Sequence, residues 1–138
     1  MNTHVLVVIG AGGIGQAIAR RQGAGKTVLL ADFSEGVLEA AAQGLAGTGY
    51  TVTTKRVDVS SRESVRSLAD EAERLGSVTA VVHTAGLSPN MAPPDRILAV
   101  DLLGTALVLE EFGRVVSPGG AGVVTLRGGG VVLPTAVR

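Results

Sequence analysis

The sequence predicts an α/β fold in which a doubly wound parallel sheet of about five strands, in the order 3-2-1-4-5, carries helices on both faces and forms three layers. Three observations lead to this prediction. Short apolar runs alternate with longer segments of helical periodicity, a glycine-rich turn at residues 10–15 joins the first strand to the first helix, and Asp32 ends the second strand. Right-handed crossovers between successive parallel strands then lead to the stated strand order.

Each expected strand is a short apolar run, and each expected helix has a start or stop signal. The strands are expected at residues 4–9, 27–31, 50–57, 78–83 and 122–126. The helices are expected at residues 13–22, 34–46, 62–75 and 95–112. Glycines at 23 and 25 stop the first helix, Ser34 and Ser61 suit the N-caps of the next two, and prolines at 93 and 94 precede the last.

We expect a single dinucleotide-binding domain over residues 1–138, with an atypical tail at 118–138. Glycine-rich segments stand on both sides of the last strand, and the final residues fit no helical pattern. Residues 131–133 form one more apolar run, which could pair back on the last strand or cover the exposed sheet edge.

The composition limits the classes of function. The 138 residues are 46% apolar and contain equal numbers of basic and acidic side chains, which is typical of a globular domain and offers no electrostatic case for nucleic acid or an anionic membrane. No apolar run approaches the roughly 18 residues that span a bilayer. Residues 1–4 lack the basic side chains of a signal peptide. The absence of cysteine excludes thiolate metal sites, so we expect a cytoplasmic protein without a metal.

The glycines at 10, 12 and 15 form the pattern G-x-G-x-x-G directly after the first strand. In a dinucleotide-binding turn the first glycine allows a tight turn, the second leaves room for a pyrophosphate, and the third lets the helix pack close to the sheet. We therefore assign Gly10, Gly12, Gly13, Ile14 and Gly15 to a cofactor site at a helix N-terminus. A turn that serves packing alone is the alternative.

Asp32 lies at the distance from the turn that suits a carboxylate binding both ribose hydroxyls of an adenosine. Such a carboxylate repels a 2′-phosphate, the glycine turn contains no Lys or Arg, and Phe33 follows Asp32. The sequence therefore favours NAD over NADP as the cofactor. The alternative is a solvated Asp32 that caps the next helix.

Two further segments follow the third and fourth strands. Asp58 and Val59 stand where a third loop would reach the adenine, although Asp58 could instead cap the following helix. Ala85 and Gly86 follow the fourth strand, where their backbone would flank the cofactor. His83, at the end of that strand, is expected to be structural and not a catalytic base.

Several segments, taken in their order, resemble the short-chain dehydrogenase/reductase family. They are GAGGIG, LLADF, VDVS, HTAG and VDLLGT, and the resemblance covers about residues 4–126. It implies a Rossmann fold, a nicotinamide cofactor and a dimer or tetramer. We expect a homo-oligomer that associates through the exposed sheet edge and the helix around residues 95–112, where apolar side chains would otherwise stay open.

The sequence departs from the family pattern at positions that matter for catalysis. The glycine turn is one residue shorter, HTAG replaces N-N-A-G, and Asp101 occupies the position of an Asn in the family's proton relay. The family's catalytic Ser and its Tyr-x-x-x-Lys pair have no counterpart, because the only Tyr is Tyr50 and the only lysines are Lys26 and Lys55. We therefore assign no catalytic residue to this chain.

Three functions stay open at this point. The chain is an oxidoreductase by family that lacks catalytic competence on its own, or a non-catalytic dinucleotide-binding sensor or partner subunit, or a binding domain that has lost the nucleotide. Since the family-like pattern stops near Val124, a shifted reading frame or a shortened coding sequence is one hypothesis, and a naturally short protein is the other. The intact turn and Asp32 favour NAD binding without turnover.

Overall fold

The structure is a computed structural model that describes residues 3–87 and 90–125. The strands are β1 (His4–Ile9), β2 (Thr27–Asp32), β3 (Thr51–Arg56), β4 (Ser77–His83) and β5 (Val116–Val124). They pair in parallel and form a five-stranded sheet in the order β3-β2-β1-β4-β5. The predicted fold class and strand order are therefore confirmed.

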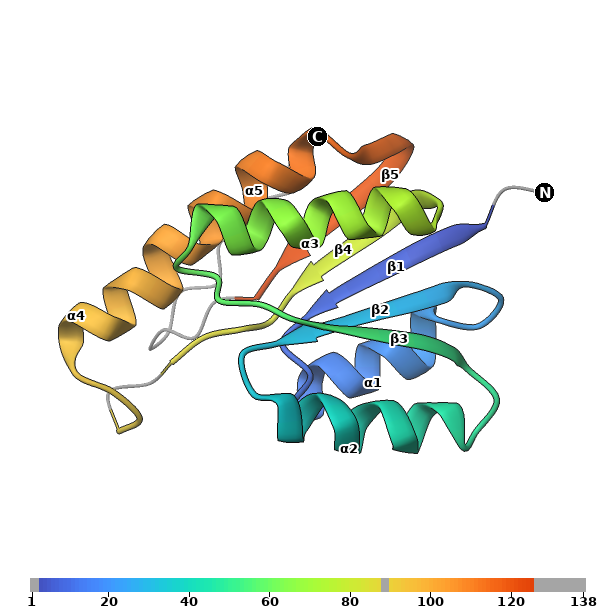
Figure 1. The fold of residues 1–138 in the computed structure, drawn as a ribbon, viewed down its shortest axis with the longest axis horizontal. Coiled ribbons are helices and arrows are strands. Elements are labelled where there is room, and N and C mark those ends of the chain that lie inside the picture. The colour runs from blue at the N-terminus through green and yellow to red at the C-terminus, as the bar shows by residue number, and fades with distance from the viewer. Residues whose placement is uncertain (1–2, 88–89, 126–138) are drawn as a thin grey trace.

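Helices cover both faces of the sheet. They are α1 (Gly13–Gln22), α2 (Glu35–Ala46), α3 (Arg62–Leu75), α4 (Pro94–Ile97) and α5 (Gly104–Gly113), with a π-helical segment η1 (Leu98–Leu103) between the last two. Figure 1 shows α1 and α2 on one face, α3 and α5 on the other, and α4 beyond the carboxyl ends of the strands. Ser34 and Ser61 are the N-caps of α2 and α3, as predicted. Within the described ranges, no helix is long and apolar enough to cross a membrane.

The core consists of two apolar layers, one on each face of the sheet. Alternate residues of β1 enter opposite layers, since Val7 and Ile9 pack towards α3 whereas Leu6 and Val8 pack towards α1 and α2. All four are fully buried, which explains why β1 is a continuous apolar run in the sequence. A shift of one residue would exchange the two layers, so this burial sets the register and with it the level at which the strands end.

The last helix differs from the single helix expected over residues 95–112. The chain forms α4, then η1 and then α5. The π-helical turn of η1 is wider than a turn of an α-helix. Within this stretch, the Thr105 hydroxyl donates a hydrogen bond of 2.6 Å to the Asp101 carbonyl. Gly104 packs so close to Val59 that a Cβ at Gly104 would lie 2.8 Å from the valine Cγ2. The helix whose periodicity predicts a regular path is thus interrupted by η1, and α5 then begins in close contact with the loop after β3.

The last strand also differs from its prediction, because it begins at Val116 and not at Gly122. The Pro-Gly-Gly segment at 118–120, which favours a turn, is taken into the strand. Val78 pairs with Val116 and Ala80 with Ala121, so β5 has extra residues there, and Gly119 adopts a φ of +82°. A bulge of this kind is how an edge strand accommodates proline and glycine. Leu126 and the possible pairing of residues 131–133 lie outside the described residues.

Glu111 of α5 is buried among three arginines and joins α5 to α3. Its carboxylate lies 3.1 Å from Arg62 Nη1 and 3.2 Å from Arg66 Nη2, both on α3, and 2.8 Å from Arg114 Nη2. Hydrogen bonds from Arg66 and Arg114 outweigh the effect of burial and hold the pKa of Glu111 at about 2, below its usual 4.5. This cluster secures the packing of the last helix over the sheet.

We expect Glu111→Gln to lower the thermal unfolding midpoint by several degrees at neutral pH, because the amide keeps the shape of the side chain but not its charge. The depressed pKa means that the stabilisation is complete above about pH 4.5 and is lost as the pH falls towards about 2. The midpoints of wild type and variant should therefore converge in acid. Glu110→Gln, at the exposed neighbour, is the control and should change little. A difference that stays constant across the pH range would contradict this role of Glu111.

Candidate functional site

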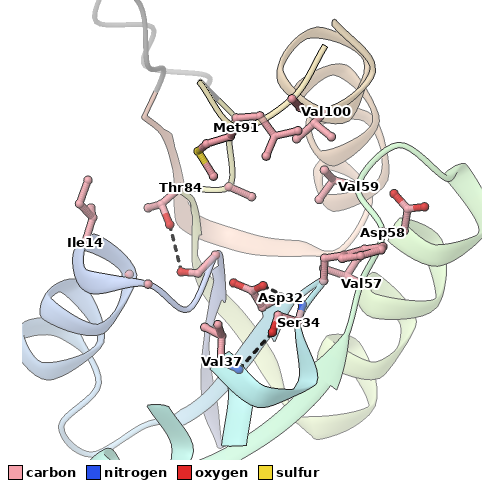
Figure 2. A pocket seen from close by; sticks show the side chains of 18 of the residues that line it. Ile14, Asp32, Ser34, Val37, Val57, Asp58, Val59, Thr84, Met91 and Val100 are labelled. Carbon is pink, nitrogen blue, oxygen red and sulfur yellow. Dashed lines mark hydrogen bonds between the residues drawn. The ribbon is translucent and has the colours of Figure 1, made fainter. Parts of the chain in front are cut away.

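A cavity of about 650 Å³ opens at the carboxyl ends of the strands (Figure 2). It is lined by every residue that the sequence assigned to the cofactor, namely Gly10, Gly12, Gly13, Ile14, Gly15, Asp32, Phe33, Asp58, Val59, Ala85 and Gly86. These residues come from the loops after β1, β2, β3 and β4, which the parallel topology brings to one edge of the sheet. The structure thus gathers them in one place, while their contact with a cofactor stays a prediction.

The glycines of the turn have three different surroundings. Gly10 has a φ of +101°, and a Cβ there would lie 2.5 Å from Thr84 Oγ1, so a side chain is excluded by both conformation and space. A Cβ at Gly15 would collide with the Gly10 carbonyl oxygen, because α1 packs directly on the turn. Around Gly12 and Gly13, by contrast, a Cβ would meet nothing within 4 Å. Two glycines are therefore needed for the backbone, and two leave open space at the cavity.

The N-terminus of α1 is left without a side-chain cap. Gly12 is the N-cap residue, it makes no side-chain hydrogen bond, and the first turn contains no acidic residue. The first N–H groups of a helix have no partner within the helix, and the helix dipole adds positive potential there. The lining therefore offers hydrogen-bond donors and room to an anionic group such as a pyrophosphate.

Asp32 connects the turn to the end of β2. Its Oδ2 accepts a hydrogen bond of 2.9 Å from the Ala11 N–H, and its Oδ1 accepts one of 2.9 Å from the Ser34 N–H. The N-cap of α2 is Ser34, whose hydroxyl accepts the Val37 N–H, so the alternative that Asp32 itself caps this helix is wrong. Each carboxylate oxygen retains capacity to accept a further hydrogen bond from a hydroxyl.

Asp58 lies in a turn at the wall of the cavity opposite Ile14, as Figure 2 shows. Its Oδ1 accepts hydrogen bonds from the Ser60 hydroxyl at 2.6 Å and from the Ser60 N–H at 3.0 Å. The hydroxyl bond is the main reason why the pKa of Asp58 lies below its usual 3.8, and the charges of Arg96 and Arg56 act in the same direction. The cap of α3 is Ser61, so Asp58 shapes the turn that precedes the helix.

The wall after β4 is held from two sides. The Thr84 hydroxyl lies 3.0 Å from the Gly10 carbonyl oxygen and donates to the turn, as drawn in Figure 2. The Asp101 carboxylate of η1 accepts the Leu87 N–H at 2.8 Å, and a Cβ at Gly86 would lie 3.4 Å from the same oxygen. Asp101 therefore acts here as a hydrogen-bond acceptor that positions the loop containing Ala85 and Gly86.

His83 is separate from the lining of the cavity. The residue is 1% exposed, and neither ring nitrogen has a hydrogen-bond partner among the described residues. Burial lowers the pKa of His83 to about 4, against the opposing effect of the Asp101 charge, so the ring is neutral at physiological pH. This placement agrees with a structural residue.

Sequence reasoning missed several residues of the lining. Ser34, Val37, Val57, Thr84, Leu87, Met91, Ala92, Arg96 and Val100 also line the cavity. Most of these residues follow a predicted strand or stand close to one in sequence. The rule that ligands bind at the carboxyl ends of parallel strands could therefore have identified them. Arg96 had no such signal, because it lies on α4, which reaches the cavity only through the tertiary fold.

Comparison with known proteins points to one family. The family model of short chain dehydrogenases matches residues 3–124. The short-chain dehydrogenase/reductase bsc3 of Alternaria brassicicola is 48% identical over 124 residues, which are 90% of this chain and 45% of that protein. The 3beta-hydroxysteroid dehydrogenase 2 of Eggerthella lenta is 38% identical over 86 residues, which are 61% of this chain and 33% of that protein. The chain thus spans less than half the length of these relatives.

Solved structures agree with the sequence matches. A short chain dehydrogenase/reductase from Burkholderia phymatum in complex with NAD has a TM-score of 0.73 and 27% identity, with coverage of 83% of this chain and 44% of its own. An alcohol dehydrogenase from the archaeon Thermococcus sibiricus, complexed with 5-hydroxy-NADP, has a TM-score of 0.75 and 31% identity, with coverage of 88% and 57%. Because the family model extends over nearly all the described residues, this chain belongs to the short chain dehydrogenase family.

Proposed function

We propose that this chain binds NAD(H) in the cavity at the carboxyl ends of the strands and is the dinucleotide-binding part of a short-chain oxidoreductase. One observation carries the proposal: Gly12 and Gly13 leave open space above an uncapped helix N-terminus, and the Asp32 carboxylate is held beside it. The NAD and 5-hydroxy-NADP complexes of two similar structures support a nicotinamide dinucleotide as the ligand.

The lining residues suit the successive parts of a dinucleotide. The N–H groups that begin α1 would hold the diphosphate, and Asp32 would accept the ribose hydroxyls. The adenine would lie against the wall formed by Val57, Asp58 and Val59. The nicotinamide, which exchanges a hydride when bound, would lie towards Ala85 and Gly86. A carboxylate at Asp32 disfavours a 2′-phosphate, which makes NAD the preferred ligand.

Among the described residues that line this cavity, none is a counterpart of the acid–base group that the family uses. Tyr50 donates its hydroxyl to the Arg20 carbonyl at 2.6 Å, and both Tyr50 and Lys26 line a second hollow at the amino ends of the strands. A proton donor must come within hydrogen-bond reach of the reacting oxygen. We therefore propose that these 138 residues on their own bind NADH without turnover.

A cavity that suits a dinucleotide but lacks an acid–base group among the described residues also favours a second candidate. This candidate is a non-catalytic dinucleotide-binding sensor or partner subunit. Fluorescence titration with NADH, followed by a hydride-transfer assay with a panel of alcohols and ketones, separates the possibilities. Binding without turnover is the expected result. Turnover by this chain alone would overturn the lack of catalytic competence, and absence of binding would overturn the proposed function.

We also propose self-association through the sheet edge at β5 and the helical stretch of residues 95–112. Exposed apolar side chains are present on η1 at Leu98 and Leu102, on α5 at Leu109 and on β5 at Val123. Light scattering at increasing concentration should show a dimer or larger species that Leu102→Asp weakens, whereas a monomer at all concentrations would contradict the proposal.

The cytoplasmic location expected from the cysteine-free sequence stays a prediction.

Asp32→Ala should weaken NADH binding by about 1–3 kcal/mol, because hydrogen bonds to a charged acceptor would be lost. Fluorescence titration measures this change. Glu39→Ala is a suitable control, since it removes an exposed acid of α2 that lies outside the cavity. Thermal unfolding should accompany each titration, because Asp32 also accepts two backbone N–H groups. Equal affinities of the three folded proteins would remove Asp32 from the site.

Gly12→Ala and Gly15→Ala should separate binding from folding. At Gly12 the methyl group has space, so the stability should stay within about 1 kcal/mol of wild type while NADH affinity falls about tenfold or more. At Gly15 the methyl group would strike the Gly10 carbonyl, and the stability should fall by about 1–3 kcal/mol. Gly113→Ala, which also has open space but lies away from the cavity, is the control for binding. Unchanged NADH affinity in Gly12→Ala would show that the turn does not approach the ligand.

A further inference from the structure

The lining of the cavity includes a thioether, which is a group that a peroxide oxidises. Met91 lies in the turn before α4 and lines the cavity, and Figure 2 shows it between Thr84 and Val100 in this view. Among the described residues that line the cavity, none is Cys, Trp, Tyr or His, so the sulfur of Met91 is the atom there that reacts most readily with a peroxide. The sequence contains no cysteine and only one other methionine, Met1, which limits the competing sites.

Met91 is open to a small oxidant from solvent. The residue is 60% exposed, which is more than the other exposed large apolar residues of the lining, namely Ile14, Phe33 and Val37. Oxidation of a methionine requires that the peroxide reach the sulfur atom, and close packing in a core prevents this approach. The exposure of Met91 therefore meets the first condition for modification.

A ligand in the cavity would cover Met91. The same cavity is lined by Gly12 and Asp32, to which the proposed function assigns the diphosphate and a ribose. The described lining residues nearest to Met91 in the sequence are Leu87 and Ala92, and both are apolar. In the unoxidised chain the thioether thus adds apolar surface to this wall, and covering such surface favours binding. A polar group at the same place would lose contact with water when the ligand binds.

We propose that Met91 is a modification site at which oxidation by a peroxide to the sulfoxide weakens dinucleotide binding. Hydrogen peroxide transfers one oxygen atom to the Met91 sulfur, so that the O–O bond breaks and an S–O bond forms. The sulfur is oxidised by two electrons, and the peroxide is reduced, since its second oxygen takes up the proton of the transferred oxygen and leaves as water. The reaction converts an apolar side chain into a polar one. This inference rests on the proposed function, because the effect is exerted on NADH binding.

Fluorescence titration of the full chain with NADH, before and after treatment with hydrogen peroxide that catalase then removes, tests the inference. Peptide mass spectrometry should show one added oxygen on Met91, and the dissociation constant for NADH should rise by about tenfold. Met91→Leu is the matched control, since it keeps an apolar side chain and leaves Met1 as the only sulfur in the chain. Peroxide should change the dissociation constant of this variant by less than about twofold, whatever its starting value. Treatment of the oxidised wild type with methionine sulfoxide reductases and a thiol reductant should restore NADH binding.

A second variant tests the effect of polarity without an oxidant. Met91→Gln places a polar group at the same position and should weaken NADH binding by about tenfold. Leu109→Gln is its control, because Leu109 is also an exposed apolar residue but lies on α5 and is absent from the described lining of the cavity. Its dissociation constant should stay within about twofold of the wild-type value. Unfolding midpoints are measured for every variant and for the oxidised chain, so that a loss of binding is compared only among folded proteins.

The outcomes distinguish this inference from the function on which it rests. If the chain binds NADH equally well before and after oxidation of Met91, the inference is overturned and the proposed function stands. An equal loss of binding in wild type and in Met91→Leu would also overturn the inference, because another group would then carry the effect of the peroxide. The same holds if Met91 stays unmodified while Met1 is oxidised. If the untreated chain does not bind NADH at all, both the inference and the proposed function are overturned.

Discussion

The site depends on a single close approach, the packing of α1 against the turn that leaves β1. The turn passes so near the helix that Gly15 rests on the Gly10 carbonyl, and neither position has space for a side chain. Three hydrogen bonds from two neighbouring segments, β2 and the loop after β4, hold this turn. Ala31 of β2 accepts the Gly10 N–H at 2.8 Å, Asp32 accepts the Ala11 N–H, and the Thr84 hydroxyl after β4 donates to the Gly10 carbonyl. The fold therefore fixes the helix N-terminus in space before any ligand arrives, which is the preorganisation that binding an anion at such a terminus requires.

Much of this arrangement follows from local sequence. The buried strands, the capping serines and the glycine turn each act over a few residues, so their outcome could be predicted without knowing the rest of the molecule. The parallel topology then places every strand's carboxyl end at the same edge, and residues assigned separately to four loops line one cavity. The role of Asp32 was the clearest gain from the structure. One carboxylate oxygen of Asp32 accepts the N–H of Ala11, 21 residues earlier, and this hydrogen bond joins Asp32 to the glycine turn. The other oxygen accepts the N–H of the nearby Ser34.

The features that escaped prediction arise from contacts between distant segments. The π-helical segment contains residues of ordinary helical character, and the helix that follows it begins where Gly104 approaches Val59, which lies far away in the sequence. Arg56 and Arg96 meet at the Phe33 ring, and these three residues come from segments that are far apart in the sequence, so no spacing rule reveals the cluster. The early start of β5 comes from the pairing of Val116 with Val78, and Pro118 and its two glycines lie in the irregular stretch before the next pair, Ala80 with Ala121.

The bulge in β5 has a consequence for the edge that this strand forms among the described residues. A strand offers its outer N–H and carbonyl groups as a template only where its backbone is regularly extended. Between Val116 and Ala121 the extra residues and the positive φ of Gly119 break that regular spacing, whereas from Ala121 to Val124 the ladder with β4 continues residue by residue. A further strand placed along β5 could therefore pair regularly only with residues 121–124. Pro118 and the two glycines after it therefore limit the pairing of this edge with the sheet edges of other molecules.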